Sequence, residues 1–134
     1  MVQWFIHSSL FEILKLYAKQ DVVVVITTDH GSVQCKKSSL VYGNRDTSTN
    51  VRYKFGDNLA CEEREALHIQ KPQDYMLPLD SLTKNYILAL ENYYFVYPTN
   101  FHHYEKQFRG SFQHGGISIE EMILPVATLL PRVA

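Results

Sequence analysis

The stretch that decides the fold of this chain is Val22-Val23-Val24-Val25-Ile26, followed directly by Thr27-Thr28-Asp29-His30-Gly31. Five β-branched residues in a row, without polar alternation, are typical of a strand covered on both faces in a parallel sheet flanked by helices. Asp29 and His30 then stand at the end of that strand, where open α/β sheets bind ligands and metals. Gly31 permits the sharp turn that brings both side chains to one ion. The alternative is that Asp29 caps a turn and His30 is simply exposed.

A helix is predicted just before this strand. Ser9 and Glu12 have the spacing of a capping box, and apolar residues follow at helical intervals, so residues 10–19 are predicted as an amphipathic helix. Two residues link it to the strand at 22–27. A helix, a tight link and a buried strand make half of a βαβ unit. The predicted fold class is therefore α/β, a partial wound sheet with flanking helices and an irregular insertion that contains a hairpin.

Residues 31–59 form that insertion, because they are rich in Gly, Ser, Thr, Asn and charged residues. The elements predicted from here on are short strands near 33–37 and 51–55, a short helix at 60–69, a hairpin of strands 86–90 and 93–97, a short helix at 100–108, one helical turn after a second capping box at Ser118 and Glu121, and an apolar strand at 123–130. We find no internal repeat and no linker that would divide residues 1–134 into separate domains.

The composition sets limits on class and location. The chain has 134 residues, of which 46% are hydrophobic, and this suits one globular domain with a core. Its net charge of -1 gives no bulk attraction to nucleic acid or to an anionic membrane. No stretch approaches a membrane span, and the first residues lack the basic region of a secretory signal. Because the two cysteines are far apart, we expect a reduced, cytoplasmic protein with no membrane partner.

His114-Gly115-Gly116 is the second candidate site. Two glycines after a histidine let the backbone approach an ion or a phosphate closely, and the helix start that follows favours anions. Together with Asp29 and His30, His114 completes an Asp, His and distant His set that suits one zinc ion or a pair of zinc ions. The alternative is an ordinary histidine in a turn.

The third candidate group is Arg45, Asn50, Arg52 and Lys54, with three hydroxyl residues between the first two. Arginine binds phosphate through a planar fork, so this segment is predicted to contact an anionic substrate. The alternative is a solvated polar loop. Aromatic residues alternate with Arg52 and Lys54, as in some grooves for single-stranded nucleic acid, but a half-buried strand has the same pattern.

The rest of the chain offers no further catalytic machinery. It contains no Gly-x-Ser-x-Gly elbow, no P-loop, no dinucleotide fingerprint and no convincing nucleophile. A centre with two metal ions needs ligands around both of them, and the three candidates supply about half of such a set.

Both metal motifs resemble those of the alkaline phosphatase superfamily. Residues 25–31 resemble its late metal-binding strand, in which an Asp-His pair binds one zinc ion and a later His binds the other. Residues 112–118, with 120–123 and Pro125, resemble that later site in the form that it has in the PglZ domain. Further similarity lies in segments 4–11, 49–54 and 96–100. It is greatest to the PglZ-type effector domain of PorX-like response regulators of Bacteroidetes, which are associated with type IX secretion.

This resemblance implies roles for three residues. Asp29 and His30 would bind the zinc ion that also holds the nucleophile, and His114 would bind the second zinc ion. The family's threonine nucleophile and its other ligands lie upstream of the matched segment. The chain thus resembles the C-terminal part of a PglZ domain, without its upstream part and without the receiver domain. We expect the parent to be a zinc-dependent phosphatase or phosphodiesterase, and this chain alone to be inactive with weak zinc binding.

A different class of function stays open. Because the chain has no nucleophile and half a metal site, it also fits a non-catalytic regulatory, dimerisation or protein-interaction module of a two-component signalling protein. In either case a sheet without its upstream strands exposes an edge, so we expect a homo-oligomer. The expected substrate is a phosphate ester or phosphodiester, and a nucleotide or nucleic acid enters only as a possible substrate.

Overall fold

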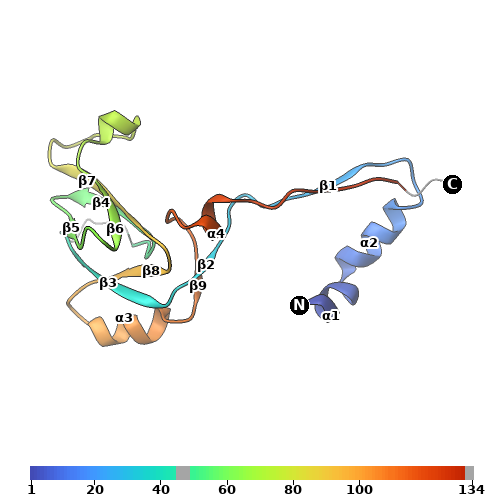
Figure 1. The fold of residues 1–134 in the computed structure, drawn as a ribbon, viewed down its shortest axis with the longest axis horizontal. Helices are drawn as coiled ribbons and strands as arrows, with labels where there is room; N and C mark the ends of the chain where they lie inside the picture. Colours follow the sequence, from blue (N-terminus) through green and yellow to red (C-terminus); the bar gives the residue numbers. More distant parts are fainter. Residues whose placement is uncertain (45–48, 132–134) are drawn as a thin grey trace. The chain divides into compact units, whose positions relative to one another are not determined.

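The computed structural model describes residues 1–44 and 49–131, which form two compact units (Figure 1). The terminal unit comprises Met1–Asp29 and the described residues from Leu124 onward, and the central unit comprises His30–Ile123. Helices occur together with several small sheets, so the predicted mixed α/β class is confirmed. No helix among the described residues has the length and apolar composition needed to cross a bilayer.

The terminal unit begins with two helices, α1 (Val2–Ile6) and α2 (Ser9–Tyr17). The predicted amphipathic helix is thus confirmed, but its cap lies one residue earlier than expected. Ser8 has an extended backbone, and its hydroxyl accepts the Phe11 N–H at 3.2 Å. Ser8 therefore caps the helix, while Ser9 already belongs to its first turn.

The strand after α2 has a partner that the sequence did not predict. β1 (Val24–Ile26) pairs antiparallel with β10 (Ala127–Leu129), and Val25 lies opposite Thr128. A strand within residues 22–27 is confirmed, but the expected parallel setting with two covered faces is wrong, because Val25 is 58% exposed. A run of β-branched residues favours extended backbone, whereas the direction of a neighbouring strand depends on distant segments.

Much of the apolar surface of the terminal unit is exposed. None of its described residues is fully buried. A cavity of about 480 Å³ lies between its helices and the β1–β10 pair, with walls that include Phe11, Leu14, Val24 and Leu129. The unit therefore has an apolar groove rather than a closed core.

The central unit contains most of the strands. Its elements are β2 (Val33–Gln34), β3 (Lys37–Tyr42), β4 (Tyr53–Asp57), β5 (Ala60–Cys61), β6 (Ala66–Ile69), the 3-10 helix η1 (Pro72–Tyr75), β7 (Lys84–Ala89), β8 (Tyr93–Val96), α3 (Phe101–Phe108), β9 (Phe112–Gln113) and α4 (Ile119–Met122). Two three-stranded sheets have the orders β5-β3-β8 and β4-β7-β6, and β2 pairs with β9. The helix predicted at 100–108 and the helical turn after Ser118 are confirmed as α3 and α4.

Two predicted elements are wrong. Residues 60–69 form the short strands β5 and β6 around a turn, not a helix. β7 and β8 do not form a hairpin, because β4 and β6 occupy both edges of β7. A turn at Glu91, with φ 41°, leads the chain to the other sheet, where β8 runs parallel to β3.

The core of the central unit is organised around β8, which is buried on both faces. Phe95, 2% exposed, packs with Val41 and Ile87 between the two sheets. Tyr94 and Val96 point to the opposite face, where the aromatic side chains of α3 cover them. Both cysteines are free thiols, and Cys35 is fully buried in this second cluster.

Lys54 in β4 is an unusual member of this interior. It is 2% exposed, its Nζ donates to the Asn50 carbonyl oxygen at 2.8 Å, and the same Nζ lies 4.7 Å from the centre of the Tyr97 ring. Burial disfavours the charged amine and lowers the pKa of Lys54 to about 8.

This lowered pKa predicts a gain of stability at alkaline pH. Between about pH 8 and 10.5 the unfolded chain keeps a proton that the folded chain has lost, so the free energy of unfolding rises with pH across this window. We expect the rise to be on the order of 3 kcal/mol larger in the wild type than in Lys54→Met. Urea unfolding of both proteins at pH 7.5 and 10.5 measures this rise in the free energy of unfolding. The control is Lys37→Met at a half-exposed lysine, and an equal rise in all three proteins contradicts the assignment.

Candidate functional site

The two histidines predicted as metal ligands lie face to face. The rings of His30 and His114 are stacked, with centroids 3.8 Å apart and planes 13° from parallel. The β2–β9 pairing explains the approach, because it sets Val33 opposite Gln113 in antiparallel register. Residues just before Val33 therefore meet residues just after Gln113.

His30 has a defined tautomer in its neutral form. Its Nδ1 lies 2.9 Å from the Gly31 carbonyl oxygen, and a carbonyl only accepts. Nδ1 therefore carries the proton, and Nε2 carries the lone pair with which an imidazole binds a metal.

Asp29, the third predicted ligand, belongs to the terminal unit, where Thr28 Oγ1 donates to Asp29 Oδ1 at 3.5 Å. Across residues 1–44 and 49–131, no three His, Cys, Asp or Glu side chains are grouped closely enough to hold a metal ion. The structure thus brings together His30 and His114.

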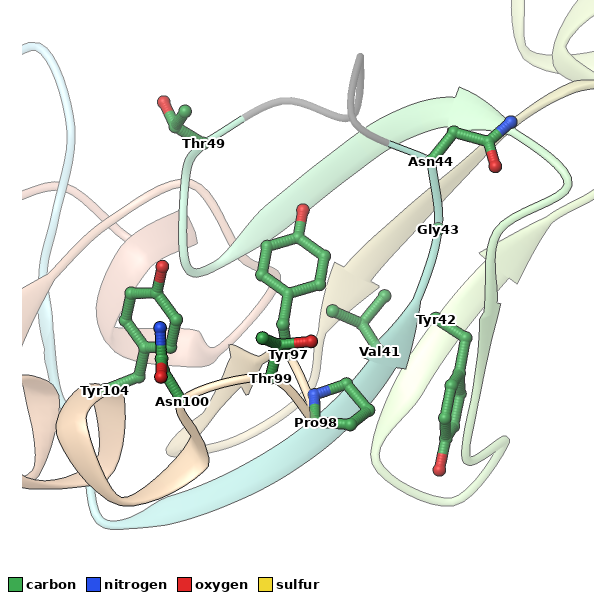
Figure 2. Close-up of a pocket in the computed structure, with 10 residues that line it drawn as sticks. All are labelled: Val41, Tyr42, Gly43, Asn44, Thr49, Tyr97, Pro98, Thr99, Asn100 and Tyr104. Atoms are coloured by element: carbon green, nitrogen blue, oxygen red, sulfur yellow. The ribbon is translucent and has the colours of Figure 1, made fainter.

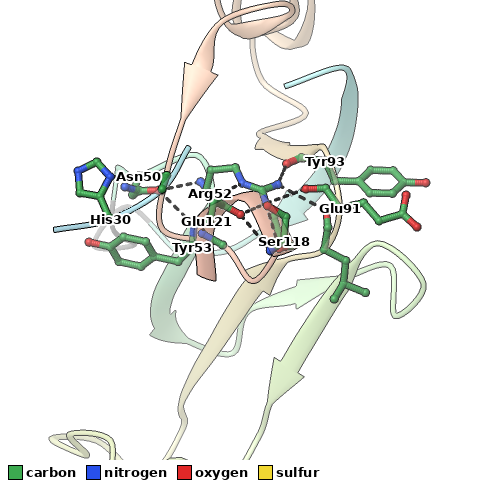
Figure 3. Close-up of polar contacts among 12 residues, drawn as sticks. His30, Asn50, Arg52, Tyr53, Glu91, Tyr93, Ser118 and Glu121 are labelled. Carbon is green, nitrogen blue, oxygen red and sulfur yellow. Dashed lines mark hydrogen bonds and ion pairs between the residues drawn. The ribbon is translucent and has the colours of Figure 1, made fainter. Parts of the chain in front are cut away.

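Arg52 and Glu121 form a buried ion pair in the same part of the central unit (Figure 3). Arg52 Nε donates to Glu121 Oε1 at 2.9 Å, and Nη2 donates to Oε2 at 2.5 Å. The side chains are 0% and 3% exposed. The same guanidinium also donates to main-chain carbonyls of the β7–β8 turn, at Ala89, Leu90, Glu91 and Tyr93. A buried guanidinium needs this number of acceptors to compensate for lost hydration.

Glu121 connects both histidine segments to Arg52. Its carboxylate accepts the N–H groups of Gly116 at 2.9 Å and Ser118 at 3.1 Å, which fixes the loop after His114. Its main-chain carbonyl accepts the Gly31 N–H at 3.2 Å. A Cβ on Gly31 would lie 1.9 Å from the Glu120 carbonyl oxygen, so only glycine permits this approach next to His30.

The electrostatics of Glu121 follow from these contacts. Burial alone would raise the pKa of its carboxyl. Hydrogen bonds from Arg52, Gly116 and Ser118 to the charged form outweigh burial and hold the pKa below its ordinary value. Glu121 is therefore an anion wherever the fold is intact at neutral pH.

The predicted substrate-contact residues differ in where they lie and in what they bond. Arg45 lies outside the described residues. Arg52 lies inside the molecule, where Glu121 and the carbonyls take up its guanidinium. Asn50 Oδ1 accepts the main-chain N–H groups of Arg52 at 2.7 Å and Tyr53 at 3.2 Å, so this side chain closes a turn.

The histidine pair suits two metal ions better than one. The lone pair of an imidazole lies in the ring plane, so two nearly parallel rings 3.8 Å apart do not direct their lone pairs at a common point. Ions in two-metal sites lie about 3.5–4 Å apart, a spacing similar to that of the stacked rings. The donors are of the type that zinc prefers, and each ion needs further ligands to reach four.

The cavities of the central unit are lined by other residues, and the largest of those described, of about 600 Å³, lies beside Val33, Asn92 and Ser118. Another of about 510 Å³ is found where β3 and β8 end and α3 begins, and Tyr97, Asn100 and Tyr104 are among its lining residues (Figure 2). Neither His30 nor His114 lines it, so it is separate from the candidate site.

Sequence reasoning missed the partnership of Arg52 and Glu121. Glu121 was recognised only as a capping-box residue, and its carboxylate does reach back to the Ser118 N–H. The available signal was an arginine next to Val51 and Tyr53 in a strand-like segment, because such an arginine requires a buried anion.

Comparison with known proteins adds a family. A family model described as the BREX system PglZ alkaline phosphatase-like domain matches residues 6–129. No curated protein sequence matches the chain significantly.

The Arg52–Glu121 pair predicts a loss of stability in Glu121→Gln. Because one charge of a buried pair is left without its partner, we expect the free energy of unfolding to fall by roughly 3–5 kcal/mol at pH 7. The depressed pKa of Glu121 stabilises the fold above about pH 4.5, and this contribution is lost as the pH falls through the folded value. The difference between wild type and variant therefore shrinks in acid.

Urea unfolding at pH 7 and pH 3.5 measures both effects. Glu120→Gln is the matched control, since it removes the same charge from an exposed neighbour. If Glu121→Gln is as stable as Glu120→Gln at pH 7, breaking the Arg52–Glu121 pair does not destabilise the fold, and the prediction is contradicted.

Proposed function

Because the chain belongs to the PglZ family of alkaline phosphatase-like domains, we propose that it contributes Asp29, His30 and His114 to a two-zinc centre that hydrolyses a phosphoric ester. The family is of the phosphoesterase type, and its superfamily generally uses metal ions. In this proposal Asp29 and His30 bind one ion, and His114 binds the other.

The observation that supports the proposal most strongly is the stack of His30 on His114. These residues are 84 positions apart in the sequence, yet their rings are 3.8 Å apart. Parallel rings suit one ion each, and the Nδ1 hydrogen bond of His30 orients Nε2 for ligation. A pair of bound ions supplies stabilisation of the attacking and leaving oxygens in an in-line displacement at phosphorus.

The proposal includes residues outside the 134 printed here. Three ligands do not fill two zinc sites, and no described residue is an evident nucleophile. We propose that a threonine and the remaining Asp and His ligands come from another part of the parent domain, and that this chain alone is inactive. We place the parent in the cytoplasm, as the effector domain of a PorX-like response regulator acting on a phosphodiester.

A second candidate is a non-catalytic interaction module. The exposed apolar residues of the terminal unit and its groove of about 480 Å³ favour it, because large apolar patches mark surfaces that bind other proteins or a second copy. Zinc titration of the full-length protein separates the two candidates. A protein that binds its partner and takes up no zinc is a module, not a hydrolase.

The hydrolase proposal predicts zinc-dependent cleavage of bis(4-nitrophenyl) phosphate by the full-length protein. Loss of a metal ligand lowers metal affinity and activity together, so Asp29→Ala and His114→Ala should each reduce the rate by about 100-fold or more. Removal of zinc by a chelator should have the same effect. His102→Ala, at an exposed position of α3, is the control and should leave the rate unchanged. Full activity in Asp29→Ala would contradict the assignment of Asp29 as a zinc ligand.

A further inference from the structure

The side-chain amide of Asn50 has a fixed orientation. Its Oδ1 accepts two main-chain N–H groups, from Arg52 at 2.7 Å and from Tyr53 at 3.2 Å. Only the oxygen of an amide accepts, so this end of the side chain must face the turn. The Nδ2 group, with its two N–H donors, must then face the opposite way.

The segment after His114 lies on that opposite side. A Cβ built on Gly115 would lie 3.7 Å from Asn50 Nδ2 and 2.7 Å from Tyr53 Cδ1. Gly115 has φ +103°, so both its backbone conformation and this close approach require glycine. In Figure 3 the dashed lines end on the amide oxygen, and the nitrogen lies on the side of the His30 ring.

Asn50 Nδ2 has two N–H groups that can donate hydrogen bonds to a ligand. Within the part of the chain that the structure describes, no acceptor bonds to Asn50 Nδ2. The guanidinium of Arg52, by contrast, is held by Glu121 and four carbonyls. Asn50 is half-buried, so its donors reach a ligand without crossing the core.

We propose that Asn50 Nδ2 donates a hydrogen bond to an anionic phosphoryl oxygen bound beside His30 and His114. This inference rests on the proposed function and adds a binding residue to the same site. A neutral amide suits the task, because it binds a phosphoryl oxygen without adding a charge next to the metal ions. The turn at Arg52 and Tyr53 orients the donor before the ligand arrives, which lowers the cost of binding.

The substitution Asn50→Asp tests the donor while the turn is kept. Aspartate keeps the oxygen that closes the turn, and it replaces the N–H donors with a carboxylate oxygen that repels an anion. In the zinc-loaded full-length protein we expect unchanged zinc content and nearly unchanged stability, with the Kd of inorganic phosphate raised roughly 10- to 100-fold. Asn58→Asp, in the exposed turn after β4, is the control for the added charge and should leave the Kd within about twofold.

The possible negative results distinguish the proposed function from the inference about Asn50. If the wild type takes up no zinc, the proposed function and this inference both fall. If zinc binds, and phosphate has the same Kd in Asn50→Asp as in Asn58→Asp, only the inference falls. A second measurement needs no variant: phosphate should shift the side-chain NH₂ resonances of Asn50 in the zinc-loaded wild type, and resonances that do not move overturn the inference.

Discussion

The buried ion pair between Arg52 and Glu121 is the interaction on which the candidate site depends. A hydrophobic pair of similar volume often stabilises a fold as well as a buried ion pair does, so we attribute to this pair chiefly a geometric role. Arg52 connects the carbonyls of the β7–β8 turn to Glu121, and Glu121 connects the loop after His114 to Gly31. Segments far apart in the sequence thus meet at one residue, Glu121, through its carboxylate and its main-chain carbonyl.

The histidine stack follows from this arrangement together with the short β2–β9 pairing. Two residues per strand are a weak sheet by themselves, and the contacts of Glu121 with Gly31 and Gly116 support the pairing. Glycine at positions 31 and 115 leaves room for the segments to meet, because a side chain at either position would clash with the neighbouring segment. The result is a pair of imidazole rings stacked face to face.

Local structure could be predicted from the sequence better than the contacts between distant segments. Capping residues and periodicity act within a few positions, so α2, α3 and the turn after Ser118 were predicted nearly in place. The partner of β1 and the separation of β7 from β8 depend on which strand edges are occupied, and no local pattern encodes that. His30 and His114 were grouped from residue type and from family resemblance, and the structure places their rings in contact. Their role as metal ligands stays a prediction. Arg52 was assigned to a substrate because its distant counter-ion is invisible in a local pattern.

The most direct test of this account is the contact between the His30 and His114 rings in solution. Nuclear Overhauser effects between their ring protons should be strong in the wild type and lost in Arg52→Lys, because lysine lacks the planar fork that holds Glu121. The contact between Phe55 and Tyr86, whose ring centroids are 5.8 Å apart in the β4–β7 pair, should persist and show that the fold is intact. A His30–His114 contact of equal strength in both proteins would contradict the central place of the ion pair.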